Sequence, residues 1–168
     1  MTSGGTVVLG LDPGSRCTGY GLVLEVSGQV SLIAAGTIRT ERESELGARL
    51  GLIYSGVSDL IERHGPSEAA IESVFVSANP ASALKLGQAR GAALAACGTR
   101  GIPVFAYEPT LVKKSLVGVG RAEKSQIAFM VGRVLGCREV MARDASDALA
   151  VAVCHLNRKR FQKLCGAL

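Results

Sequence analysis

The first strand-like run of the chain stops at a carboxylate and a tight turn, and this feature constrains the fold most. Residues 6–12 (TVVLGLD) are apolar and β-branched, and they end at Asp12-Pro13-Gly14, a strong turn signal. Residues 17–26 and 30–39 have similar strand character and are joined around Ser27-Gly28. The chain is therefore predicted to open as an antiparallel meander of three strands.

Helices and strands alternate in the rest of the chain. Apolar residues recur at helical spacing over 45–64, and residues 68–74 (EAAIESV) are predicted as a short strand. Asn79 and Pro80 suit the cap and first position of a helix over 80–99. The remaining elements are a strand at 102–107 and helices at about 109–116, from Ala122 to about Leu135, and from about Asp144.

This order of elements predicts an α/β fold of the ribonuclease H-like type, as a single domain over residues 1–168. Its sheet is mixed and five-stranded, with three antiparallel meander strands plus two parallel strands, and helices flank it. In such a sheet the first and fourth strands lie side by side, and a C-terminal helix crosses near their ends.

Composition narrows the class of protein. The chain is 48% hydrophobic and 20% charged, which is typical of folded globular domains. No apolar stretch reaches the roughly 18 residues of a membrane span, and the N-terminus lacks the pattern of a signal peptide. We expect no membrane association and a cytoplasmic location. The five scattered cysteines form no C-x-x-C pair, which argues against a zinc site and against a disulfide framework.

The distribution of positive charge favours a nucleic-acid partner. Nineteen Lys and Arg against fourteen Asp and Glu give a net charge of +5, and the pI is about 9.1. Two clusters hold much of the excess: Lys113, Lys114, Arg121 and Lys124, then Arg158, Lys159, Arg160 and Lys163. Aromatic residues make up only 4% and tryptophan is absent, which argues against a single-strand reader built on stacked aromatic side chains.

Two carboxylates occur in predicted strands: Asp12 at the end of the first strand, and Glu72 within a strand that is otherwise suited to burial. Asp12 closes the first strand, although Asp before Pro-Gly also occurs in ordinary turns. Glu72 interrupts an otherwise apolar strand, where an unpaired carboxylate costs several kcal/mol or has a raised pKa. A bound cation would compensate that charge. The alternatives are an outward-facing glutamate or a pairing with arginine.

Asp144 and Asp147 are spaced i, i+3, so they share one face of the predicted final helix. The alternative is that they serve the helix start, as an N-cap followed by an acidic residue that complements the dipole. Four converging carboxylates would repel one another without cations and would form a hard, oxygen-rich site with two Mg²⁺. Two such metals are a recurrent solution for phosphodiester hydrolysis. The separation between His64 and His155 does not match that of a metal-binding pair, and both are interpreted as structural or surface residues.

Several sequence blocks resemble the RuvC family of Holliday junction resolvases. These blocks are GLDPGSRCTGYGL (10–22), AIESVF (70–75), SALKLGQARG (82–91), VGVGRAEKSQI (117–127) and DASDALAVAVCH (144–155). The resemblance implies a homodimer that binds four-way DNA junctions and nicks them symmetrically, leaving 5′-phosphate and 3′-hydroxyl ends. It also implies Mg²⁺, with Mn²⁺ as a substitute, and a branch-migration complex of RuvA and RuvB as partner.

The resemblance also assigns roles to individual residues. The catalytic, metal-binding carboxylates are Asp12, Glu72, Asp144 and Asp147, with Lys124 as a further catalytic residue. The resemblance also implies DNA contacts at Phe75, Lys113 and Lys124. From the residues themselves, Lys114 is expected to contact DNA as a member of the same basic cluster, and Arg16 and Arg90 are expected to contact the DNA backbone. The lysines suit phosphate contacts, although ordinary solvated positions are the alternative; Phe75 suits contact with bases, although burial in the core is its alternative.

A stripe of small residues follows Leu84 on the helix over 80–99, at Gly87, Gly91 and Ala95. This stripe permits close approach either to the chain's own sheet or to a second copy across a two-fold axis. Three other functions compete with the resolvase interpretation. One is an actin-like kinase or ATPase, which requires a longer chain. The second is a related nuclease that cuts structured RNA or an RNA–DNA hybrid. The third is a junction-binding module without catalytic activity, which would lack one of the four carboxylates, whereas all four are present.

Overall fold

The computed structural model describes residues 5–73, 79–137 and 141–166, and a mixed five-stranded sheet lies at its centre. Its order is β3-β2-β1-β4-β5. The strands are β1 (Thr6–Asp12), β2 (Cys17–Val26), β3 (Gln29–Arg39), β4 (Glu68–Glu72) and β5 (Val104–Tyr107). The first three pair as an antiparallel meander, whereas β4 is parallel to β1 and β5 is parallel to β4. The predicted fold class is therefore confirmed.

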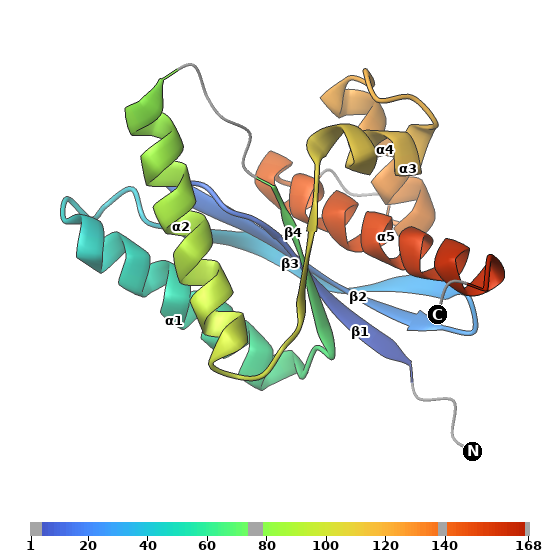
Figure 1. Cartoon of the computed structure of the whole chain (residues 1–168), viewed down its shortest axis with the longest axis horizontal. Coiled ribbons are helices and arrows are strands. Elements are labelled where there is room, and N and C mark those ends of the chain that lie inside the picture. Colours follow the sequence, from blue (N-terminus) through green and yellow to red (C-terminus); the bar gives the residue numbers. More distant parts are fainter. Residues whose placement is uncertain (1–4, 74–78, 138–140, 167–168) are drawn as a thin grey trace.

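Helices cover both faces of the sheet (Figure 1). On one face lie α1 (Leu46–His64) and α2 (Pro80–Gly98), which pack against each other. On the other face α5 (Arg143–Leu164) crosses the sheet, with α3 (Pro109–Val117) and α4 (Lys124–Leu135) packed against it. Within the described ranges no helix is long and apolar enough to cross a membrane.

The alternation of side chains along the strands divides the core into two layers. Leu9 and Leu11 of β1 are fully buried toward α1 and α2. Val8 is buried in the other layer, with α5 and its neighbouring helices. Asp12 lies an even number of residues from Val8 and therefore faces the same side of the sheet. Glu72 likewise faces the same side as Ala70, which is buried in the same layer as Val8. Both carboxylates therefore come from strand ends on the face that α5 covers.

The predicted element boundaries differ from the observed ones by a few residues. The strand predicted over 68–74 ends at Glu72, and Val74 lies outside the described residues. β5 begins at Val104 rather than at 102; Pro103 precedes it and cannot donate a ladder hydrogen bond, although its carbonyl accepts from Ala69 N. α4 begins at Lys124 rather than at Ala122.

The predicted cap of α2 is confirmed. Asn79 Oδ1 accepts hydrogen bonds from the backbone N–H groups of Ala81 and Ser82, at 3.0 and 3.4 Å. Pro80 occupies the first helical position, where the missing N–H costs nothing.

Candidate active site

Two carboxylates meet where β1 and β4 end. Gly10 and Leu11 of β1 are in register with Ala70 and Ile71 of β4, so Asp12 and Glu72 follow side by side in parallel strands. Together with Asp147 of α5 they line a pocket of about 170 Å³. The remaining lining residues are Pro109, Val112, Lys113, Lys124, Ile127 and Ala150. The pocket therefore joins three acidic and two basic side chains within an apolar frame, and we call it the acidic pocket.

Glycines in β1 and β2 allow α5 to approach the sheet closely. A Cβ on Gly10 would lie 2.1 Å from the Ala148 carbonyl oxygen, and a Cβ on Gly19 would lie 2.0 Å from the Asp144 carbonyl oxygen. Only residues without side chains fit there, because ordinary contacts begin near 3.4 Å. Gly19 is also the register partner of Asp12. The absence of two side chains thus places the first turns of α5 beside Asp12, and sequence reasoning did not predict this packing role for either glycine.

The turn after Asp12 is held by two buried threonines. Thr18 Oγ1 accepts from Gly14 N at 3.5 Å and lies 3.4 Å from the Gly14 carbonyl oxygen, to which it donates. Thr40 Oγ1 donates to the Ser15 carbonyl at 3.2 Å. Gly14 itself leaves no room for a side chain, since its Cβ would meet the Cys17 carbonyl at 2.2 Å. These contacts hold the turn that follows Asp12, and sequence reasoning assigned this role to neither threonine.

A buried polar network secures α5 farther along its length. His155 is 3% exposed and lies between the Tyr107 hydroxyl (2.7 Å from Nδ1) and Glu68 Oε2 (2.6 Å from Nε2). Because the Glu68 carboxylate accepts, Nε2 donates to it, and in the neutral imidazole Nδ1 then accepts from the Tyr107 hydroxyl. Lys159 also pairs with Glu68. The interpretation of His155 as structural agrees with this geometry.

Burial and mutual repulsion disfavour ionisation in the acidic pocket. Desolvation, followed by the charges of Glu72 and Asp147, raises the pKa of Asp12 from 3.8 to about 7. Desolvation and then Asp147 also raise the pKa of Glu72. Lys124 opposes both shifts, and Lys113 opposes that of Glu72. The pocket therefore favours added positive charge.

Lys124 supplies part of this charge in the structure. Its Nζ donates to Asp147 Oδ2 at 2.7 Å, and its side chain is 53% exposed, compared with 17% for Asp147. Lys124 is the first residue of α4, and Lys113 lies on α3. Two helices thus direct ammonium groups to the carboxylates, and the exposed stem of Lys124 allows it to turn toward another anion.

Asp144 lies at the margin of the acidic pocket. It is half-buried and is not among the lining residues, and of the charges that act on Asp12 its effect is the smallest. Burial, followed by the nearby Asp144 carboxylate, raises the pKa of the Cys17 thiol to about 11, which places Asp144 beside β2. The N-cap alternative for Asp144 is wrong, because Ala142 holds that position; Asp144 does lie in the first turn, where it complements the dipole.

The donor set suits a hard divalent cation, because Mg²⁺ and Mn²⁺ prefer carboxylate oxygens. The buried and mutually repelling Asp12, Glu72 and Asp147 are the observation that favours such an ion. As they stand, the described residues contain no three His, Cys, Asp or Glu side chains arranged to hold a metal. Asp147 is instead engaged by Lys124.

The other predicted contact residues are dispersed. Arg16 is exposed in the turn after Asp12, and Lys114 is exposed on α3. Arg90 is half-buried on α2, and its buried Nε has no hydrogen-bond partner within the described ranges. Phe75 lies outside the described residues.

The C-terminal basic cluster is partly committed to contacts within the fold. Lys159 pairs with Glu68, and Arg160 donates to Glu25 Oε1 and to the Gly28 carbonyl, both at 2.7 Å. The charge count of this cluster therefore overstates the positive charge that it offers to a nucleic acid.

A ribonuclease H-like sheet with carboxylates gathered at the ends of its two adjacent parallel strands defines a class of nucleases. The family model described as crossover junction endodeoxyribonuclease RuvC matches residues 8–155. The chain therefore belongs to the RuvC family of crossover junction endodeoxyribonucleases, enzymes that hydrolyse phosphodiester bonds in DNA. The family resemblance found in the sequence is confirmed.

Individual relatives agree with this assignment. The crossover junction endodeoxyribonuclease RuvC of Solidesulfovibrio magneticus is 62% identical over 165 residues, which cover 98% of each chain. That of Legionella pneumophila is 44% identical over 163 residues, covering 96% of this chain and 94% of the relative. The structure of T. thermophilus RuvC in complex with a Holliday junction substrate superposes with a TM-score of 0.87, at 34% identity, covering 93% of this chain and 96% of that one.

Proposed function

We propose that this chain resolves Holliday junctions in homologous recombination and DNA repair by Mg²⁺-dependent hydrolysis of phosphodiester bonds. The observation that carries the proposal is the acidic pocket, where Asp12, Glu72 and Asp147 meet Lys113 and Lys124. The substrate follows from the similar T. thermophilus protein, whose structure contains a Holliday junction.

Asp12, Glu72, Asp144 and Asp147 would together hold two Mg²⁺, with Mn²⁺ as a substitute. Bound there, the metal ions supply activation of the attacking water and stabilisation of the leaving 3′-oxygen. The products are 5′-phosphate and 3′-hydroxyl ends. Asp144 joins this set because it lies next to the pocket on the same helix face as Asp147.

Other residues of the chain bind and position the DNA. Lys124, released from Asp147, and Lys113 bind the scissile phosphate as point charges. Val112 and Ile127 on the apolar side of the pocket exclude water. Arg16, Arg90 and Lys114 contact the DNA backbone, and Phe75 contacts bases near the crossover.

The proposal includes a homodimer formed through α2. Gly87, Gly91 and Ala95 are exposed, Leu84 is 64% exposed, and nothing lies within 4 Å of a Cβ built on either glycine. The stripe of small residues thus faces outward, away from the chain's own sheet, which favours the second of its two interpretations. Two active sites related by a two-fold axis suit symmetric nicks in a symmetric junction. A cytoplasmic location and a partnership with RuvA and RuvB complete the proposal.

The direct test compares a synthetic four-way junction, a plain duplex and an RNA–DNA hybrid, each with Mg²⁺ or EDTA. We expect paired nicks in the junction alone, dependent on Mg²⁺. Preferential cutting of the hybrid would instead support a nuclease for RNA-containing substrates, and equal cutting of the plain duplex would contradict junction specificity.

A further inference from the structure

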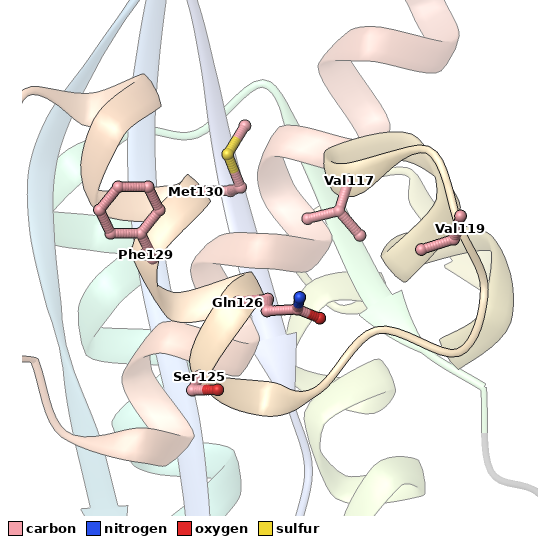
Figure 2. A pocket seen from close by; sticks show the side chains of 6 residues that line it. All are labelled: Val117, Val119, Ser125, Gln126, Phe129 and Met130. Atoms are coloured by element: carbon pink, nitrogen blue, oxygen red, sulfur yellow. The ribbon is translucent and has the colours of Figure 1, made fainter.

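A second hollow, which we call the α3–α4 groove, adjoins the acidic pocket. It has a volume of about 410 Å³. It is lined by Val117, Val119, Ser125, Gln126, Phe129 and Met130 (Figure 2). Lys124 and Ile127, in the same first turns of α4, line the acidic pocket instead. One helix, α4, therefore separates the two hollows and contributes residues to both.

The groove exposes large apolar side chains that the fold does not use. Phe129 is 65% exposed and Val119 is 59% exposed, whereas Ile127 and Val131 on the inner face of α4 are buried. Exposed apolar side chains gathered around a hollow indicate a binding surface. An aromatic ring at the rim favours an occupant with a flat face.

The surrounding charge favours an anionic occupant. Residues 109–135 contain five basic side chains and one acidic side chain, so this segment carries four of the five excess positive charges of the chain. Lys114, Arg121 and Arg133 are exposed there. A polyanion that also presents flat, apolar rings is a nucleic-acid strand with unpaired bases.

We propose that the α3–α4 groove receives an unpaired nucleobase of the DNA strand whose phosphate enters the acidic pocket. This inference rests on the proposed function. Phe129 stacks on the base, and Val117 and Met130 form the apolar wall behind it. Gln126 Oε1 accepts from Glu123 N at 3.0 Å, so its Nε2 is the group offered to the edge of the base. The groove thereby favours DNA whose bases are unpaired beside the cleavage point.

The absence of tryptophan from the sequence makes a direct test possible. Phe129→Trp introduces a single reporter in the groove, and Phe161→Trp, at a 58% exposed position on α5, is the matched control. Both are placed in an Asp12→Asn background so that the DNA stays intact. We expect a saturating four-way junction to quench the emission of the F129W protein by about half through base stacking, and to leave that of the F161W protein unchanged.

Two further comparisons separate stacking from mere proximity. A junction with abasic sites beside the cleavage point should bind without quenching the F129W reporter. In the otherwise unchanged chain, Phe129→Ala should weaken binding of the intact junction about tenfold and of the abasic junction much less.

The outcomes distinguish this inference from the proposed function. Equal responses of the F129W and F161W proteins, with junction cutting by the parent chain retained, would overturn the base-binding role alone. An F129W signal that changes with protein concentration in the absence of DNA would assign the groove to a second copy of the chain and would also overturn it. If the parent chain neither binds nor cuts junctions, the proposed function itself fails.

Discussion

Replacing Gly19 with alanine tests whether the close approach of α5 builds the site. The added Cβ would lie 2.0 Å from the Asp144 carbonyl oxygen and 3.1 Å from the Asp144 Cβ. To reach ordinary van der Waals distance, the backbone of α5 must retreat by on the order of 1 Å. The obstructing atom belongs to the backbone, so no side-chain rotation relieves the contact.

The expected magnitudes follow from this displacement. A misplacement of about 1 Å in catalytic groups costs on the order of 100-fold in rate. Overpacking of a close helix–sheet contact lowers the free energy of unfolding by about 1–3 kcal/mol. We therefore expect Gly19→Ala to fold, to bind junctions, and to cut them at least about 100-fold more slowly.

The assay is single-turnover cleavage of a four-way junction, with urea unfolding and junction binding measured on the same protein. Gly51→Ala is the matched control, because Gly51 is an exposed helical residue of α1 with nothing within 4 Å of its added Cβ. It should cut normally and gain about 0.5–1 kcal/mol of stability. A Gly19→Ala protein that cuts at the normal rate would refute the argument that this approach positions the carboxylates.

Three other predictions concern charge and assembly. Asp12→Asn should abolish cutting but retain junction binding. Without divalent cations the same substitution should raise the free energy of unfolding at pH 8, because the pKa of Asp12 is raised to about 7 and the fold therefore disfavours the ionised carboxylate. This gain in stability should shrink as the pH falls from 7 to 4. A gain in urea unfolding that does not depend on pH would contradict the pKa argument. Lys114→Ala should weaken junction binding and reduce the slope of log K against log[salt] by about one phosphate contact. Arg63 is exposed on α1, and Arg63→Ala should leave this slope unchanged. Equal slopes for the two variants would argue against a phosphate contact at Lys114. Gly91→Leu should shift the chain toward monomer in sedimentation without unfolding it, because nothing lies within 4 Å of an added Cβ, and an unchanged dimer would exclude the α2 stripe as the interface.

The order of strands and two of the carboxylates could be predicted because each depends on local signals. The apolar run ending at Asp12 and the acidic interruption at Glu72 are visible in single segments. Parallel pairing of their strands then brings the two ends together. The stripe Gly87-Gly91-Ala95 was visible as well, but only its exposure on the folded surface favours a partner copy over the chain's own sheet.

Other features depend on contacts between distant residues and could not be predicted from local patterns. Gly10 and Gly19 look like ordinary strand glycines until α5 lies against them. Lys159 and Arg160 counted as free positive charge until Glu68 and Glu25 were found beside them. Asp144 resembled an N-cap because the sequence does not show that the helix has already begun at Arg143, with Ala142 as its N-cap.

The central claim is that Asp12, Glu72, Asp144 and Asp147 share divalent cations, and anomalous diffraction from crystals soaked in Mn²⁺ tests it most directly. We predict Mn²⁺ peaks in the acidic pocket with carboxylate oxygens of all four residues as ligands, and Lys124 turned away from Asp147. Mn²⁺ bound elsewhere on the molecule, with the Lys124–Asp147 ion pair intact and the carboxylates uncoordinated, would contradict the claim.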